Sequence, residues 1–373
     1  MRRVSADRAA TPPEDAPRPI RVLVVEDSHL IAWLLRRWIE EEPGLELAGA
    51  AKNGEEAPAL AAKTRPDVVL LDIEMPVMDG LQALPLILDA CPSARVLMVS
   101  ALTQRNAQMT FEALSRGAAD YLAKPEPANG GSSSPRFRDE LVAKIKAVAQ
   151  STVRSSQRFG DASRLGPDGS IAQLRPFSMV VPRLVTIGSS TGGPNALTNL
   201  LTPLRNALHR VPVLITQHMP SVFTAALAER IQEVTGLPAK EGEDGEALRP
   251  GHIYLAPGER HMVLAPGDKP TISINDAPPL NFHRPSVDLL FESAAGVYGA
   301  GVLAVVLTGM GSDGTSGAKA IVEKGGNVLV QDKCSSVVWG MPAAVLEAGL
   351  ASAEGPPLRL AETMRMLLQG ERL

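Results

Sequence analysis

Aromatic residues and cysteines are both scarce in this chain of 373 residues. Phe, Trp and Tyr make up only 3% of the sequence, which argues against an aromatic stacking platform for single-stranded nucleic acid. The two cysteines, Cys91 and Cys334, lie far apart, so neither a disulfide scaffold nor a cysteine-based zinc site is expected. With 37 Lys and Arg against 41 Asp and Glu, the net charge of −4 gives no broad basic surface, and no nucleic-acid partner is expected.

Long apolar runs are missing as well. No run approaches the roughly 18 residues that a spanning helix needs, so we expect no membrane insertion. Arg2 and Arg3 are not followed by an apolar segment, which argues against a signal peptide and predicts a cytoplasmic protein. The length predicts two domains, each large enough to form its own core.

The N-terminal half alternates between apolar strand-like runs and helical patterns. Residues 1–18, rich in proline and charge, are expected to form a disordered leader. Residues 19–150 then carry five strand–helix units, which predict an α/β domain of (βα)5 type with a doubly wound parallel sheet. The expected strands are Ile20–Val25, Glu46–Ala50, Val68–Leu71, Val96–Val99 and Tyr121–Ala123.

A polar stretch rich in Ser, Gly and Pro, residues 151–181, is predicted to be an interdomain linker. The alternation resumes over residues 182–373, which predicts a second doubly wound α/β domain with an antiparallel portion. Within it, Ile253–Leu255 and Met262–Leu264 are interpreted as a hairpin, with His252 and His261 as structural residues beside it.

Five polar residues follow strands of the first domain. Because ligands of open parallel sheets bind at the carboxyl ends of the strands, we expect these side chains to converge. Three carboxylates suit Mg²⁺, and a lysine with a hydroxyl could hold an anion, as phosphoryl transfer onto a carboxylate would require. The alternative is that each acid merely caps the next helix. The five residues are Glu26, Asp27, Asp72, Ser100 and Lys124.

The motifs VVEDS, LDIEMPVMDG, MVSAL and DYLAKP resemble those of response-regulator receiver domains. The resemblance implies that Asp72 accepts a phosphoryl group from a histidine kinase. It also implies that Glu26 and Asp27 join Asp72 in binding Mg²⁺, although Asp is commoner than Glu at the first of these positions. The implied switch residues are Ser100, Tyr121 and Lys124.

The second domain opens with a strand followed by Gly188-x-Ser190-x-Gly192, the pattern of a nucleophile elbow. A serine N-cap in a glycine-rich turn is the plain alternative. His218 follows the expected strand Val211–Thr216, and Asp313 follows Val302–Leu307. If these strands are neighbours, nucleophile, base and orienting acid could meet in one crevice.

Two further patterns in this domain are candidates for binding or lining a site. Gly309-x-Gly311-x-x-Gly314 matches a dinucleotide-binding pattern, but it stands late in its domain and contains an Asp, so nucleotide binding is disfavoured. His283, with Arg284 and Asp288, could line the cleft or be structural.

The motifs IGSSTGGP, TQHMP, HRPSVD and LTGMGSDG resemble the catalytic domain of the bacterial chemotaxis protein-glutamate methylesterases, the CheB family. The resemblance implies Ser190 as nucleophile and His218 and Asp313 as the rest of a triad. Backbone N–H groups near Thr191 and Met310 would hold the oxyanion. Ser189 stands where this family commonly has Ala.

A receiver followed by a methylesterase domain is this family's own architecture. The implied function is phosphorylation-activated hydrolysis of glutamate γ-methyl esters on methyl-accepting chemoreceptors, releasing methanol, together with deamidation of receptor glutamines. It would serve chemotaxis or a related pathway, with no cofactor for the esterase and a monomeric state. Two rivals stay open: a receiver joined to a non-catalytic interaction domain, and a receiver-controlled hydrolase of small esters.

Overall fold

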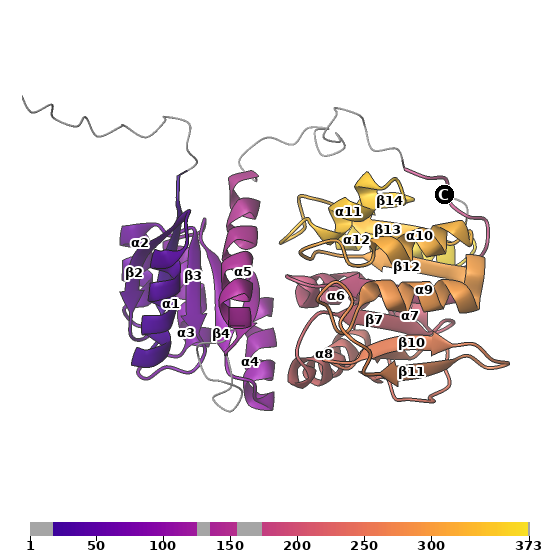
Figure 1. Cartoon of the computed structure of the whole chain (residues 1–373), viewed down its shortest axis with the longest axis horizontal. Helices are drawn as coiled ribbons and strands as arrows, with labels where there is room; N and C mark the ends of the chain where they lie inside the picture. The colour runs from indigo at the N-terminus through magenta and orange to yellow at the C-terminus, as the bar shows by residue number, and fades with distance from the viewer. Residues whose placement is uncertain (1–17, 125–134, 155–173, 372–373) are drawn as a thin grey trace, which may run out of the picture.

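The computed structural model describes residues 18–124, 135–154 and 174–371. Two α/β domains lie side by side, joined after helix α5 (Pro135–Arg154) (Figure 1). The expected leader, apart from Arg18, and residues 155–173 of the expected linker lie outside the described residues. Among the helices of the described part, none combines the length and apolar character needed to cross a membrane.

The N-terminal domain is built on a five-stranded parallel sheet with strand order β2-β1-β3-β4-β5. All five residues of β3 are buried, as expected for a strand covered by helices on both faces. Asp79 and Gln82 form a reciprocal capping box that fixes the start of α3. The elements are β1 (Ile20–Val25), α1 (His29–Glu41), β2 (Leu45–Ala51), α2 (Ala57–Thr64), β3 (Val68–Asp72), α3 (Gly80–Ala90), β4 (Arg95–Ser100), α4 (Gln104–Ser115) and β5 (Asp120–Ala123), followed by α5.

The C-terminal domain has a seven-stranded sheet, and every strand pair in it is parallel. Its strand order is β14-β13-β12-β6-β7-β9-β8, and a separate antiparallel hairpin pairs β10 with β11. The strands are β6 (Leu184–Ser189), β7 (Val213–Gln217), β8 (Ala239–Glu241), β9 (Ile253–Leu255), β10 (His261–Ala265), β11 (Thr271–Asn275), β12 (Val302–Val306), β13 (Asn327–Gln331) and β14 (Ala353–Gly355). The helices are α6 (Gly193–Leu201), α7 (Arg205–Leu208), α8 (Ser221–Thr235), α9 (Val287–Tyr298), α10 (Thr315–Glu323), α11 (Met341–Glu347) and α12 (Pro357–Leu368).

The fold class expected from the sequence is confirmed, but the expected hairpin is wrong. Ile253–Leu255 is β9, which runs parallel between β7 and β8, whereas the hairpin pairs His261–Ala265 with Thr271–Asn275. A short apolar run carries no signal for its pairing partner, because the choice depends on contacts made elsewhere in the domain.

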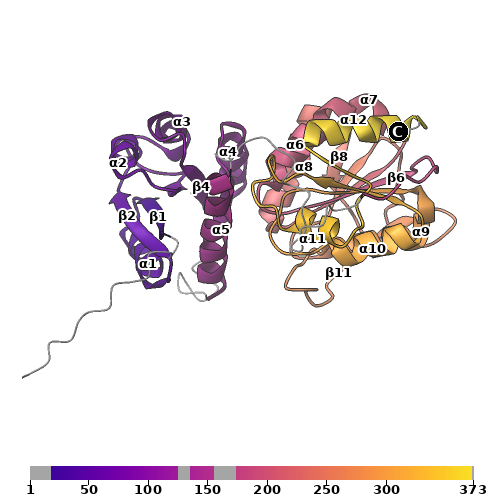
Figure 2. The same ribbon diagram turned by 90° about the horizontal axis from the view of Figure 1, so that it is seen from above.

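The two domains are in direct contact, with α4 of the first against α6 and α8 of the second (Figures 1 and 2). Tyr121 of β5 also contacts α8. At the centre of this contact the ring of Tyr121 stacks on that of Phe223, with centroids 4.4 Å apart. Phe111 meets the same ring edge-on at 6.3 Å. One hydrophobic cluster therefore continues from the first domain into the second.

Candidate active site and phosphorylation site

The turn after β6 presents a serine at the carboxyl edge of the sheet. Ser190 donates its backbone N–H to the carbonyl of Thr308 at 3.0 Å, and Gly193 donates to the carbonyl of Ser190 at 2.8 Å. Gly192 has φ of 74°, a left-handed conformation suited to glycine. A Cβ on Gly309 would lie 2.8 Å from that of Ser190. Glycine at position 309 thus lets the loop after β12 approach the serine.

The strands that carry the expected triad are neighbours. β12, β6 and β7 are adjacent in the sheet, and Ser189 pairs with Gln217 in register. The backbone N–H of His218 donates to the carbonyl of Ser189 at 3.0 Å. The structure therefore brings the serine turn, the histidine and the loop of Asp313 to one edge of the sheet, as the sequence predicted.

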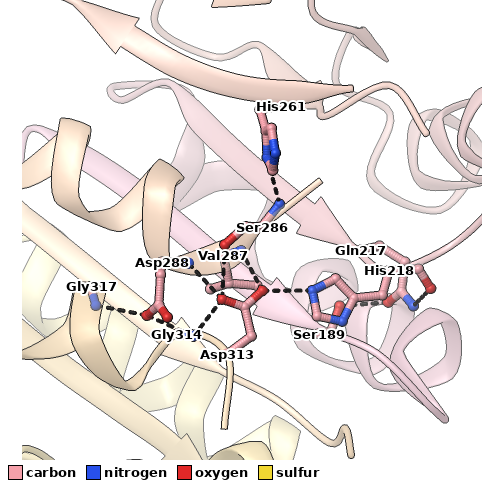
Figure 3. A network of polar contacts seen from close by, with 10 residues as sticks. All are labelled: Ser189, Gln217, His218, His261, Ser286, Val287, Asp288, Asp313, Gly314 and Gly317. Carbon is pink, nitrogen blue, oxygen red and sulfur yellow. Dashed lines mark hydrogen bonds and ion pairs between the residues drawn. The ribbon is translucent and has the colours of Figure 1, made fainter. Parts of the chain in front are cut away.

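His218 and Asp313 are directly joined. Nε2 of His218 lies 2.8 Å from Oδ2 of Asp313 (Figure 3). Nδ1 of His218 is buried and has no hydrogen-bond partner among the described residues. Because the carboxylate holds Nε2–H, the ring is fixed in the tautomer whose Nδ1 is a free acceptor. The imidazole can therefore take a proton at Nδ1.

Asp313 is held from several sides by the start of α9. It accepts hydrogen bonds from the hydroxyl of Ser286 at 2.9 Å and from the N–H groups of Val287 at 2.7 Å and Asp288 at 3.0 Å (Figure 3). Burial would raise the pKa of Asp313, but the hydrogen bond and charge of His218 and these N–H donors lower it below its ordinary value. Asp313 is thus an ionised carboxylate, fit to orient His218.

Asp288 lies behind Asp313, away from the serine turn. Its carboxylate accepts from the N–H groups of Gly314 at 2.9 Å and Gly317 at 2.8 Å (Figure 3). Burial, with the neighbouring charge of Asp313, raises the pKa of Asp288 to about 6. Its contacts make it a brace between α9 and the start of α10.

Of the three residues considered as possible cleft lining, Asp288 contacts Asp313 and His283 lies against His218. Its imidazole stacks on that of His218, with centroids 4.0 Å apart and planes 6° from parallel. Burial, with the nearby His218, lowers the pKa of His283 to about 4. Arg284 instead donates to the carbonyls of Asp276 and Ala277. The two histidines expected to be structural differ in exposure: His261 is fully buried, whereas His252 is partly exposed.

Gln217 is a residue of the site that sequence reasoning missed. Its buried amide accepts a hydrogen bond from the hydroxyl of Ser189 at 2.6 Å and donates to the carbonyl of His218 at 3.2 Å (Figure 3). It also donates to the carbonyl of Ser190 at 2.8 Å. A Cβ on Gly193 would lie 1.9 Å from its amide oxygen. Gln217 therefore ties the serine turn to the histidine turn. The available signal was a polar residue ending a strand whose other residues are apolar or Thr.

The loop that matched a dinucleotide pattern belongs to this site. Gly309 packs against Ser190 and against Met341. The carboxylate of Asp313 is hydrogen-bonded to His218 and to the first N–H group of α9. Met310 is 38% exposed beside the serine turn, whereas Thr191 is buried, with its carbonyl bonded to the Thr308 hydroxyl at 2.9 Å.

The acidic residues of the N-terminal domain also converge. Ligand oxygens of Glu26, Asp27 and Asp72 lie within 4.8 Å of one another. Nζ of Lys124 lies 2.8 Å from Asp72 and 3.0 Å from Glu26. Burial and the charge of Asp72 raise the pKa of Glu26 to about 7, and burial raises that of Asp72, while Lys124 opposes both shifts. Three crowded carboxylate oxygens are a donor set that fits a hard divalent cation.

Of the expected switch residues, Ser100 lies on β4, the strand next to that of Asp72, and Tyr121 lies on β5, one strand further out. The hydroxyl of Ser100, fully buried, is bonded to that of Thr110 at 3.1 Å. Tyr121 is turned inward against Phe223 of the other domain. Its neighbour Asp120 accepts a hydrogen bond from the N–H of Gly192, in the serine turn, at 3.3 Å and pairs with Lys144 at 2.9 Å. The first domain thus touches the turn that carries Ser190.

Comparisons with known proteins agree with this arrangement. Residues 185–364 match the family model of the CheB methylesterase, and residues 22–130 that of the response regulator receiver domain. A protein-glutamate methylesterase/protein-glutamine glutaminase of Nitrobacter hamburgensis is 46% identical over 362 residues, covering 95% of each chain. One of the same name from Rhodopseudomonas palustris, strain BisB5, is 45% identical over 367 residues, again with 95% of each chain covered.

Among solved structures, the Thermotoga maritima CheB methylesterase catalytic domain is 40% identical. It covers 50% of this chain and 100% of its own, with a TM-score of 0.49. The two family-model matches define a class: a response-regulator receiver domain joined to a methylesterase domain. The chain belongs to the CheB methylesterase family, as expected from its motifs. Receiver domains generally bind Mg²⁺ at their phosphorylation site, and a methylesterase with a receiver implies chemoreceptor substrates and a kinase as phosphodonor.

Proposed function

We propose that this protein hydrolyses γ-methyl esters of glutamate residues on methyl-accepting chemoreceptors through an acyl-enzyme on Ser190. The observation that supports it best is the bond between His218 and Asp313, which leaves Nδ1 as a free acceptor beside the serine turn. In the proposed reaction Nδ1 takes the proton of Ser190, and the serine oxygen attacks the ester carbonyl.

The tetrahedral intermediate carries its charge on the former carbonyl oxygen. We propose that backbone N–H groups at Thr191 and Met310 stabilise this oxyanion. Protonated His218 then gives its proton to the leaving methoxide, and methanol departs. Water, activated by His218, releases the glutamate carboxylate and restores Ser190. With a glutamine side chain in place of the ester, ammonia leaves instead, which gives the deamidation we also propose. None of these steps needs a cofactor.

The proposed phosphoryl acceptor is Asp72, with a histidine kinase as donor. Glu26, Asp27 and Asp72 would hold Mg²⁺, which offsets the charge of the transferring phosphoryl group. Lys124, already 2.8 Å from Asp72, would contact the phosphoryl oxygens. We propose that Ser100 and Tyr121 respond to phosphorylation, and that movement of Tyr121 loosens its stack on Phe223.

The contact between the two domains supports a proposal for how phosphorylation regulates the enzyme. Unphosphorylated, the receiver touches the serine turn at Gly192 and α8 at Phe223, which obstructs a protein substrate. We propose a monomeric enzyme that acts in the cytoplasm, in chemotaxis or a related chemosensory pathway.

Methanol release from a methylated chemoreceptor fragment tests the proposal. Ser190→Ala should abolish release, whereas the matched control Ser189→Ala should keep most of it, because the Ser189 hydroxyl is buried against Gln217. A small phosphodonor with Mg²⁺ should stimulate wild type but not Asp72→Ala. Release that persists in Ser190→Ala would reject the nucleophile. Absence of release from wild type with a matching receptor would favour a non-catalytic domain, and equal turnover of simple esters would favour a small-ester hydrolase.

A further inference from the structure

A tight turn next to the triad carries an unusual residue. Leu280 and His283 exchange both backbone hydrogen bonds, at 3.1 and 2.9 Å, so Asn281 and Phe282 form a two-residue hairpin loop. Both loop residues have positive φ, 49° for Asn281 and 69° for Phe282. This is the pattern of a type I′ turn, whose second position favours glycine. Asparagine suits the first position, but phenylalanine is poorly suited to the second.

The side chain of Phe282 is also fully exposed, at 100% of its possible area. Single exposed apolar residues are common on protein surfaces and need no explanation by themselves. Here, however, the same residue combines backbone strain with full exposure, and packing against the described part of the chain offsets neither. Strained residues gather at functional sites, where another requirement selects them.

The position of the turn beside His218 suggests a functional reason for a strained, exposed phenylalanine. Phe282 directly precedes His283, whose ring stacks on that of His218. Met310, the other exposed apolar residue near the triad, directly follows Gly309, which packs against Ser190. Of the other large apolar side chains that are exposed among the described residues, four belong to the receiver: Leu30, Trp33, Val77 and Leu86. The remaining four are Met179, Val180 and Val181, which precede β6, and Leu358 on α12. One exposed apolar residue therefore directly follows a residue that packs against Ser190, and another directly precedes a residue that stacks on His218.

We propose that Phe282 is a specificity residue that contacts an apolar side chain of the protein substrate beside the esterified glutamate. The proposal rests on the proposed function, since it needs a protein as substrate. A methyl ester offers little surface of its own, so affinity for its carrier must come from neighbouring contacts. A fully exposed ring on a short, hydrogen-bonded turn gains apolar burial when the substrate covers it, and the turn itself loses little freedom on binding.

Substituting Phe282→Gly in the full-length protein separates binding from folding. Glycine fits the left-handed position, so the variant's Tm should equal or exceed that of wild type. Its KM for the methylated receptor fragment should rise roughly 10-fold, because the buried ring is lost from the complex. The value of kcat should change little, since the triad is untouched. Phe282→Leu, which keeps an apolar side chain, should recover part of the affinity.

Trp33→Ala is the matched control, because Trp33 is an exposed aromatic residue on α1, in the other domain. Its KM should equal that of wild type. An unchanged KM in Phe282→Gly, while Ser190→Ala abolishes release, would overturn the role of Phe282 and leave the proposed function intact. A clear fall in the Tm of Phe282→Gly would also overturn it, because Phe282 would then serve the fold. Absence of release from wild type would reject both proposals.

Discussion

The imidazole rings of His218 and His283 lie 4.0 Å apart and within 6° of parallel. The lowered pKa of His283, about 4, means that this ring is uncharged wherever His218 acts as a base. His283 is therefore a flat, neutral surface against which the imidazole of His218 rests, while Asp313 holds the edge of that imidazole.

This stack predicts that ring shape matters more than basicity at position 283. His283→Phe should keep kcat/KM near wild type and preserve the shape of the pH–rate profile between pH 5 and 9. His283→Ala should lower kcat/KM about five-fold, the effect of losing one ring contact of about 1 kcal/mol. Methanol release measured across this pH range checks both. A new ionisation in the profile of His283→Phe would contradict the prediction.

Replacing Gln217 should lower kcat more than replacing Ser189, whose hydroxyl is hydrogen-bonded to the amide of Gln217. Gln217→Ala removes the link between the carbonyls of Ser190 and His218, and the misplaced groups should cost about 10²-fold in kcat with little change in KM. Ser189→Ala removes a single hydrogen bond, worth about 1 kcal/mol of stability, and should leave kcat within a few-fold. Steady-state kinetics and urea unfolding of both variants test this. Similar kcat values for the two would show that Gln217 does not position the site.

Asp288 should make stability depend on pH in a defined window. Its pKa is raised to about 6 in the fold, chiefly by burial, from an ordinary value of 3.8. The unfolded chain therefore releases this proton first as the pH rises, and the fold loses stability between about pH 4 and pH 6. Asp288→Asn keeps an acceptor for Gly314 and Gly317 without the charge.

Urea unfolding of both proteins from pH 4 to pH 8 measures this effect. As the pH rises from about 4 to 6, the free energy of unfolding of Asp288→Asn should increase by roughly 2 kcal/mol relative to that of wild type. Above about pH 6 the difference between the two proteins should stay constant. Curves that stay parallel throughout would mean that Asp288 ionises normally.

Weakening the contact between Tyr121 and Phe223 should uncouple the two domains. Phe223→Leu removes the ring stack but keeps an apolar side chain in the buried position, so basal methanol release should rise about five-fold. Stimulation by a small phosphodonor should fall by the same factor, because part of the domain separation has already occurred. Leu200→Val, a comparable buried change in the same cluster, should leave both unchanged. Unaltered basal activity in Phe223→Leu would place regulation elsewhere.

Several parts of this molecule could be predicted from the sequence for identifiable reasons. The central strands of the receiver are continuous apolar runs because both sheet faces are buried there, and all five of its strands were predicted within one residue at either end. Ser190, His218 and Asp313 could be grouped because each follows such a strand.

Other features depend on contacts that one sequence does not encode locally. The edge strands β8 and β14 have three residues each and little apolar content, so no pattern marked them. Three such contacts join residues that are far apart in the chain. They are the pairing of β9 with β7, the stack of Tyr121 on Phe223 and the hydrogen bonds of Gln217 to the serine turn. The turn at Phe282 could not be predicted either, because its second residue contradicts the preference of the turn that it forms.

In the seven-stranded parallel sheet every strand ends at one edge, and the receiver touches Gly192 and Phe223 near that same edge. On the proposed regulation, receiver and substrate therefore compete for one place, and only molecules with separated domains can bind substrate. The apparent affinity for substrate is then the intrinsic affinity multiplied by the fraction of separated molecules. Phosphorylation can raise that fraction no higher than one. The fraction already separated before phosphorylation thus sets a ceiling on stimulation, however completely Asp72 is modified.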